Sequence, residues 1–549
     1  MRNQYTPNLS AAFSLIAGAA ITIGLVDAAL IASLRFGAAG AFQYIPPRLW
    51  VIAPLCWLAV ALLVAIPAVA LSRRWGAHAT LVAMLTLFFA VRLGAQSRLR
   101  MAAGAIVGIV ACAVAIFIAK RWLAAPRRAA AIVATILIIA FAAAAIERVD
   151  TKQSTTTKPP ARPDVVVIVL DTVSHDAIFP NGRDVDPRMP NLARLAQRGI
   201  VFDRAYTTAP WTLPSHFSAV TGLPAHDLGV DFDDQRYTRS VPTLAQRYRR
   251  DGYRTAAVLS NTFLNRGTGF ERGFDSFEHA GRALDICRTV PGLLVDRYSP
   301  WFAATVCNWS AREVTDRALA HIRDDPRPLF LFLNYMDAHD PYYVAPECRE
   351  RDTKSGRFRD VPPAAYRREH YANHIAAIRC IDRNLGRLFR AFQREPIVAV
   401  LSDHGEQFGE HNLVRHGNSV YDQLLHVPML LAGPHISPRR VTEPISIAEL
   451  PRLLTSPELA IAPSPVISFL AGSTATGGIE QWSILRGPWH FISRRGREEL
   501  YDLQSDPHEL QNRAGETQLL NEFRAELAKQ RRRNDDETTR TFRSLGYVR

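Results

Sequence analysis

The stretch VVVIVLD at residues 165–171 decides how this chain folds. Six consecutive apolar residues lead directly into Asp171, a pattern typical of a strand that is buried on both faces of a parallel sheet. Similar apolar runs occur at residues 255–259, 329–333 and 397–401. Amphipathic patterns predict helices over residues 191–197, 242–248 and 371–390. Alternating strands and helices predict an α/β domain with a mostly parallel sheet sandwiched by helices.

The end of the chain has a different pattern. Short strands, separated by Arg-Gly turns, are predicted at residues 482–485, 489–493 and 499–503. They indicate a small C-terminal antiparallel subdomain. We therefore expect a linker over residues 151–163, a catalytic domain over 164–478 and a C-terminal subdomain with its tail over 479–549. The Pro- and Thr-rich composition of TKQSTTTKPPARP supports the linker assignment.

Two of the predicted strands end in acids. The strand at residues 165–170 leads into Asp171, and the strand at 397–402 leads into Asp403 and His404. In open α/β sheets ligands gather beyond the carboxyl ends of the strands. Two carboxylates and an imidazole at neighbouring strand ends predict a site for one divalent metal ion.

The segment TLPSH at residues 212–216 supplies a candidate nucleophile. Pro214 fits an early helix position, Thr212 fits the cap region before it, and Gly222 is expected to end the helix. A hydroxyl at a helix start lies near free N–H groups and the positive end of the helix dipole, which stabilise an alkoxide and the anion it attacks. An ordinary Thr cap is the alternative interpretation.

Residues 1–150 have the composition of a membrane domain. Each of five apolar runs is close to the roughly 20 residues that span a bilayer. The runs cover residues 9–34, 49–71, 77–93, 101–118 and 129–146. We predict an all-α domain of about five transmembrane helices, with the first acting as an uncleaved signal anchor. The mild Arg and Lys bias of the loops predicts an inner-membrane, multi-pass protein whose catalytic domain is extracytoplasmic.

Charge and cysteine content fit this interpretation. Residues 1–150 hold 13 of the Lys and Arg residues against 3 Asp and Glu, so the basic excess lies between the apolar runs. The remainder has no dense basic stripe interleaved with aromatic residues, and we predict no nucleic-acid partner. An even set of four cysteines follows residue 150 and can form disulfides in an exported domain, with sequence neighbours as candidate pairs. They are Cys287, Cys307, Cys348 and Cys380.

The motifs together resemble the sulfatase family of the alkaline phosphatase superfamily. Their order is LDT, TLPSH, TGL, HDPY, SDHGE and GEH, followed by an ELYDL..DP.E ending at residues 499–509. The resemblance covers roughly residues 164–513 and implies the family's fold. The N-terminal runs lie outside it. A similar layout of five helices before an exported catalytic domain occurs in phosphoethanolamine and lipoteichoic-acid transferases of the superfamily.

The resemblance implies roles for individual residues. Asp171, Asp403 and His404 would bind the metal ion, and Thr212 would be the nucleophile and fourth ligand. His339 matches the family's substrate-facing His, and His416 lies near the position of a Lys that contacts sulfate.

The remaining positions depart from the family's pattern around the substrate. His216 stands where the family has Arg, so it would contact the substrate. Ser260 falls where a second Lys is expected, and Asn261 would partly replace that Lys.

Two further departures bear on the chemistry. The family usually has Cys or Ser at the nucleophile position, matured to formylglycine, whereas Thr212 cannot be converted, so no formylglycine is expected. Thr172 follows Asp171 where many sulfatases have a second ligand Asp. This favours a one-metal, four-ligand site, in which His404 favours Mn²⁺ or Zn²⁺ over Ca²⁺.

Three functions follow from these features. The first is a membrane-anchored, metal-dependent hydrolase of sulfate or phosphate esters that acts through a Thr nucleophile. The second is a phosphoethanolamine- or phosphoglycerol-type transferase that modifies an envelope lipid or glycan. The third is a non-catalytic envelope binding protein. The expected partners are the lipid bilayer and an anionic ester, either a sulfated or phosphorylated lipid or a glycan.

Overall fold

The computed structural model describes most of the chain after the predicted linker. The described residues are 162–280, 309–322, 325, 327–342, 344–354, 360–458, 464–473, 476–515 and 517–544, with side chains of the last helix as far as Arg532. The five apolar runs predicted to cross the membrane lie outside these residues. No helix within the described ranges is both long and apolar enough to cross a bilayer.

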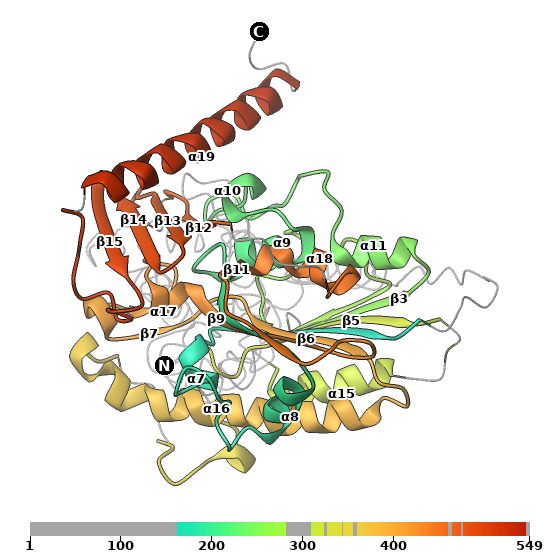
Figure 1. Cartoon of the computed structure of the whole chain (residues 1–549). Helices are drawn as coiled ribbons and strands as arrows, with labels where there is room; N and C mark the ends of the chain where they lie inside the picture. The colour runs from blue at the N-terminus through green and yellow to red at the C-terminus, as the bar shows by residue number, and fades with distance from the viewer. Residues whose placement is uncertain are drawn as a thin grey trace, which may run out of the picture. The chain divides into compact units, whose positions relative to one another are not determined.

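A nine-stranded sheet forms the centre of the described domain (Figure 1). The spatial order is β10-β2-β9-β6-β1-β5-β3-β4, and β11 also pairs with β2. Only β9 runs antiparallel to its neighbours β2 and β6 among these pairs, so the predicted mostly parallel sheet is confirmed. The strands are β1 (Val165–Leu170), β2 (Gly199–Tyr206), β3 (Arg254–Leu259), β4 (Ser276–His279), β5 (Leu329–Tyr335), β6 (Ile397–Ser402), β9 (His426–Ala432), β10 (Arg439–Val441) and β11 (Ile445–Ser446).

Helices cover both faces of this sheet (Figure 1). One face carries α9 (Thr212–Thr221), α10 (Ala225–Leu228), α11 (Leu244–Arg250) and α18 (Leu450–Thr455), the last preceded by the 3₁₀ turn η3 (Ile447–Glu449). The other face carries α7 (His175–Ile178), α8 (Pro190–Arg198), α15 (Ala311–His321) and α16 (Pro363–Ala391). The predicted sandwich of helices around the sheet is therefore confirmed.

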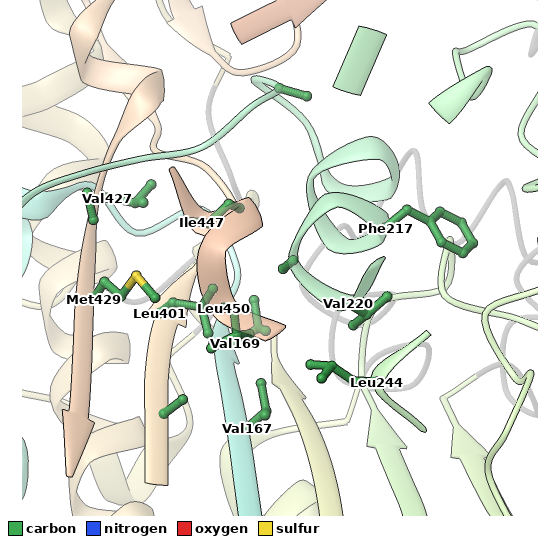
Figure 2. Packing of buried hydrophobic residues seen from close by; sticks show 14 of the residues in the cluster. Val167, Val169, Phe217, Val220, Leu244, Leu401, Val427, Met429, Ile447 and Leu450 are labelled. Atoms are coloured by element: carbon green, nitrogen blue, oxygen red, sulfur yellow. The ribbon is translucent and has the colours of Figure 1, made fainter. Parts of the chain in front are cut away.

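The continuous apolar run of β1 follows from these two layers. Val167 and Val169 pack toward α9 and α18, in one cluster with Leu401 of β6 and Met429 of β9 (Figure 2). The intervening residues, such as Ile168, face the opposite layer of helices. Both faces exclude water, so no position of the strand favours a polar side chain. Burying such aliphatic side chains stabilises the fold by about 1.5–3 kcal/mol each.

All three predicted helices have different bounds in the structure, and α8 exceeds its predicted range by one residue at each end. Helix α11 begins two residues later than predicted, because Thr243 and Gln246 form a capping box around its first turn. Helix α16 begins at Pro363, eight residues before the predicted start. The residues of its first two turns, PAAYRREH, show no regular apolar spacing. Pro at the first position favours helix initiation.

The tail forms a separate antiparallel sheet, as predicted, but with four strands where three were predicted. Its strands are β12 (Val466–Leu470), β13 (Gln481–Arg486), β14 (Trp489–Arg494) and β15 (Arg497–Asp502). The sheet begins before the predicted boundary at residue 479, because β12 pairs with β13. Helix α19 (Thr517–Ser544) packs Leu520, Phe523 and Leu527 on the apolar face of this sheet.

Short elements surround the edge where the parallel strands end. They are η1 (Pro346–Cys348), β7 (Gln407–Phe408), η2 (Glu410–Asn412), β8 (Val414–Arg415) and α17 (Asp422–Leu425). A disulfide joins Cys348 to Cys380 and ties the loop after β5 to α16. This pairing of sequence neighbours agrees with the expectation, while Cys287 and Cys307 lie outside the described residues.

Candidate active site and metal centre

Four adjacent strands place polar side chains at one edge of the sheet. In the order β6-β1-β5-β3, these strands bring together residues that are far apart in the sequence. Asp403 and His404 follow β6, Asp171 follows β1, Asn334 lies near the end of β5 and Asn261 follows β3. All five side chains are buried. The predicted meeting of acids at this edge is therefore present in the structure.

Asp171, Asp403 and His404 form a group with the geometry of a metal site. One ligand atom from each lies within 4.8 Å of the others, and within the described part of the chain no other group of three or more His, Cys, Asp and Glu residues does so. Asp171 Oδ2 accepts hydrogen bonds from Asn261 Nδ2 at 2.7 Å and Asn334 Nδ2 at 3.1 Å. Asp403 Oδ1 accepts from the backbone N–H groups of His404 at 2.9 Å and Thr172 at 3.2 Å.

The second oxygen of each carboxylate has no hydrogen-bond partner among the described residues. These two atoms are Asp171 Oδ1 and Asp403 Oδ2, and both are buried. Leaving a buried polar atom unsatisfied costs about 1–3 kcal/mol, and more when the group is charged. A divalent cation held by these oxygens would remove that cost, so the residues present fit the metal ion that the fold implies.

His404 is prepared to act as a ligand through one ring nitrogen. Its Nδ1 lies 3.0 Å from the carbonyl oxygen of Gly405, to which it can donate only when Nδ1 carries the hydrogen. This tautomer leaves the lone pair of Nε2 directed at the acidic group, 3.3 Å from Asp403 Oδ2. Burial and the neighbouring charge of His416 lower the pKa of His404 well below its usual value, which favours the neutral ring that a metal ion requires.

The two acids have opposite pKa shifts. Burial and the charge of Asp171 raise the pKa of Asp403 well above its usual value. Burial also acts to raise the pKa of Asp171, but the charges of His339, His404 and His216 outweigh it, and this pKa is lowered. Two carboxylates in one dry site repel each other when both are ionised. A cation between them would relieve that repulsion.

Thr212 is the first residue of α9, and Trp211 occupies the cap position. The expected placement of Thr212 in the cap region is off by one residue, and its hydroxyl does not cap the helix. Thr212 Oγ1 instead lies 3.2 Å from Asn261 Nδ2 and 3.5 Å from His404 Nε2. Helix α9 ends as predicted at Gly222, which has a φ of 86°. The Thr212 hydroxyl therefore lies beside the candidate metal ligands, at the start of a buried helix.

His216 lies one turn along α9 from Thr212. Its Nδ1 is 2.9 Å from the carbonyl oxygen of Thr212 and 3.4 Å from Asp403 Oδ2. Its Nε2 is 3.4 Å from Asn334 Nδ2. Burial lowers the pKa of His216 to about 4, against the raising effect of Asp171. The sequence analysis missed Asn334, although an amide within the apolar run LFLFLNY was a detectable signal.

The rings of His339 and His416 contact each other, and that of His416 also contacts His404. Their ring centroids are 4.9 Å apart, and the ring of His416 lies 4.4 Å from that of His404. His416 Nδ1 is 3.0 Å from Glu406 Oε1. His339 Nδ1 is 2.7 Å from the carbonyl oxygen of Asp340. Glu406 belongs to the SDHGE motif, but its contact with His416 was not anticipated.

These two histidines differ in their protonation. Burial and the charge of His339 lower the pKa of His416 to about 3. Burial also acts to lower the pKa of His339, but the charges of Asp171 and Glu406 outweigh it, and this pKa is raised. The lowered pKa favours the neutral ring in His416, whereas the raised pKa favours the protonated ring in His339.

Ser260 and Asp337 are polar residues close in sequence to site residues, but their hydrogen bonds are made to other parts of the fold. The hydroxyl of Ser260 donates to the carbonyl oxygen of Trp309 at 2.8 Å. Asp337 accepts from the backbone N–H of Ala311 at 2.8 Å and so caps the start of α15. Neither belongs to the acidic group around Asp171.

The comparisons with known proteins identify the family to which a chain with this fold and this group of buried polar residues belongs. The family model Sulfatase matches residues 163–454. The chain is 23% identical over 461 residues to a Delta 4,5-hexuronate-2-O-sulfatase of Bacteroides thetaiotaomicron, covering 70% of this chain and 91% of the relative. It is 25% identical over 434 residues to a Choline-sulfatase of Rhizobium meliloti, covering 64% and 82%.

A solved structure shares the fold. It is a phosphonate monoester hydrolase of Agrobacterium radiobacter, with a TM-score of 0.53, 18% identity, and coverage of 68% of this chain and 96% of that one. Because the family model covers more than half of its residues, the chain belongs to the sulfatase family. The resemblance of the sequence motifs to the sulfatase family is thus confirmed. The chain is a hydrolase of sulfuric or phosphoric esters.

Proposed function

We propose that this protein is a metal-dependent hydrolase of phosphate or sulfate esters in which Thr212 is the nucleophile. One observation carries the proposal. The Thr212 hydroxyl lies 3.5 Å from His404 Nε2, beside two acids that each have an unsatisfied oxygen. The proposed nucleophile and the proposed metal ligands thus lie in one buried site. The presence of all four residues in one place argues against a non-catalytic binding protein.

The proposed reaction has two displacements. Asp171, Asp403, His404 and Thr212 would hold the metal ion, which would supply Lewis-acid charge neutralisation when bound. Thr212 Oγ1 loses its proton to water and attacks the phosphorus or sulfur of the ester in line, while the bond to the leaving oxygen breaks. His339 donates a proton to that oxygen. Water then attacks the group on Thr212 and restores the free hydroxyl.

Three other groups contact or support the reacting atoms in this proposal. Asn261 can donate to Thr212 Oγ1 or to an oxygen of the bound anion, because its Nδ2 is already 3.2 Å from that hydroxyl. His216 holds the first turn of α9 against Asp403. His416 can contact the anion from the side of His339. The His ligand favours Mn²⁺ or Zn²⁺ over Ca²⁺, which prefers oxygen ligands.

The nucleophile predicts a preference between esters. Sulfate bound to a plain Thr has no neighbouring hydroxyl to expel it, so no formylglycine-type release is possible, whereas phosphothreonine can be attacked by an activated water. We expect 4-nitrophenyl phosphate to be hydrolysed faster than 4-nitrophenyl sulfate, in preparations made without a formylglycine-generating system. Initial rates on this matched pair, at equal metal concentration, provide the measurement. A strong preference for the sulfate ester would contradict the assignment.

We also propose a cellular location for this protein. The five apolar runs before residue 150 and their loop charges support an inner-membrane anchor with the catalytic domain outside the cytoplasm. The Cys348–Cys380 disulfide supports the same location, since disulfides persist mainly in oxidising compartments. The bilayer would then be a constant partner, and the substrate an anionic lipid or glycan of the envelope.

This topology predicts the result of a reporter fusion. Alkaline phosphatase fused after Arg549 should be active, because it folds only outside the cytoplasm, and a fluorescent reporter that requires the cytoplasm should be dark. The same two reporters fused after residue 75, in the loop between the second and third runs, should give the opposite pair of results. A bright cytoplasmic reporter after Arg549 would overturn the five-span topology.

A transferase remains the second candidate, and Thr212 is the observation that favours it. A phospho-group on Thr can pass to an acceptor hydroxyl as readily as to water when that hydroxyl occupies the site. Product analysis with a phospholipid donor distinguishes the two functions, because transfer consumes the acceptor while hydrolysis does not.

A further inference from the structure

Residues 411–422, here called the His416 segment, lie between the site and the small antiparallel sheet. On the side of the site, the N–H of Gly417 donates to the carbonyl oxygen of Pro210 at 2.9 Å, two residues before Thr212. His416 itself contacts Glu406 at 3.0 Å. The position of this segment therefore sets where the His416 ring stands relative to Thr212.

On its other side, the His416 segment is held by the small sheet. Gln481 of β13 donates from Nε2 to the carbonyl oxygen of Asn418 at 2.9 Å. The hydroxyl of Tyr421 donates to Oε2 of Glu499, on β15, at 2.9 Å. The ring of Tyr421 also stacks on that of His411, with centroids 3.7 Å apart and an interplanar angle of 6°. The small sheet thus contacts the His416 segment at two positions, Asn418 and Tyr421.

Glu509, which follows the last strand, adds a buried anchor. Its side chain is 0% exposed, and Oε2 accepts the backbone N–H of Asp422 at 2.9 Å. Its other oxygen, Oε1, accepts from Nδ1 of His490 on β14. The remaining ring nitrogen of His490 is 2.6 Å from the hydroxyl of Ser483 on β13. A chain of hydrogen bonds therefore runs from two strands of the small sheet to the end of the His416 segment.

We propose that Glu499 and Glu509 are positioning residues, which hold His416 at the catalytic site through Tyr421 and Asp422. This inference rests on the proposed function of His416. The small antiparallel sheet then contributes to the reaction, although none of its strands supplies a candidate metal ligand. Each carboxylate fixes a donor within a few residues of His416, and a displaced ring would lose its contact with the bound anion.

The chain offers a matched pair of variants to test this. Tyr421 and Tyr501 donate to the same oxygen of Glu499, at 2.9 and 2.8 Å, but only Tyr421 belongs to the His416 segment. Tyr421→Phe keeps the ring that stacks on His411 and should lower kcat/KM for 4-nitrophenyl phosphate about tenfold, the effect of one lost hydrogen bond to a charged group. Tyr501→Phe should stay within about twofold of wild type.

A double-mutant cycle with His416→Ala in the full chain, assayed with Mn²⁺, separates positioning from general destabilisation. If Tyr421 acts through His416, Tyr421→Phe should cause no further loss once His416 is Ala. The same tenfold loss in both backgrounds, or no loss in Tyr421→Phe alone, would overturn the inference. Full activity of His416→Ala would contradict the role of His416 itself, and with it the positioning.

A second readout does not depend on turnover. Hydrogen exchange of the peptide covering residues 411–421 should rise in Tyr421→Phe and match wild type in Tyr501→Phe. Should the wild-type protein hydrolyse neither ester, the proposed function fails, and this comparison still decides whether the sheet holds the segment. Unchanged hydrogen exchange in Tyr421→Phe would refute the claim that the small sheet fixes the His416 segment through Tyr421.

Discussion

Replacing Thr212 with Ala is expected to lower kcat for ester hydrolysis by about 10³-fold or more, the scale on which loss of a catalytic nucleophile acts. The hydroxyl is buried beside His404 and Asn261, so no other described side chain stands in the same place to attack the ester. The fold should survive, because the hydroxyl caps no helix. Steady-state rates on 4-nitrophenyl phosphate, with circular dichroism for the fold, provide the measurement.

Thr212→Ser is the matched control for this prediction. It keeps the oxygen and removes only the methyl group, so a substantial part of the activity should remain. Full activity in Thr212→Ala would show that the nucleophile lies elsewhere. Equal loss in both variants would point to a packing role for the Thr side chain instead of a chemical one.

Replacing Asp403 with Ala is expected to remove the bound metal ion and, with it, most of the activity. The variant deletes one of three close ligand atoms and leaves Asp171 facing His404 alone. Loss of groups that only orient ligands costs 10- to 100-fold in metal affinity, so loss of a ligand should cost more than about 100-fold. His404→Ala should behave in the same way. Metal content of the purified protein, measured by elemental analysis after dialysis, tests both variants.

Asp337→Asn is the control for a buried acid outside the site. Burial raises the pKa of Asp337 to about 7, and its partner is the backbone N–H of Ala311. The neutral amide keeps an acceptor for that N–H, and metal content should match wild type. Full metal occupancy in both Asp403→Ala and His404→Ala would refute the assignment of the site.

The strands could be predicted because the apolar pattern that identifies each strand lies within its own residues. A run such as Val165–Leu170 has no polar position, which requires two covered faces and therefore a parallel sheet between helices. Once the sheet is inferred, the acids that follow β1 and β6 must lie at the same edge, so the meeting of Asp171 with Asp403 could be expected before the structure was known.

Other features depend on contacts between distant segments and could not be predicted in this way. Asn334 completes the site because β5 lies between β1 and β3, and that strand order is not encoded in any local pattern. The contact of Glu406 with His416 depends on how the loop after β6 folds back. The hydrogen bond from the backbone N–H of Asp422 to Glu509 joins the start of α17 to the segment after β15, 87 positions apart.

The central claim is that Thr212 becomes covalently bonded to the group removed from the ester. Intact mass spectrometry after acid quenching of the enzyme with 4-nitrophenyl phosphate and Mn²⁺ tests it most directly. We predict a species heavier by one phosphoryl group, mapped by peptide fragmentation to Thr212 and absent from Thr212→Ala. A phosphoryl group on another residue, or an adduct that persists in Thr212→Ala, would contradict the account.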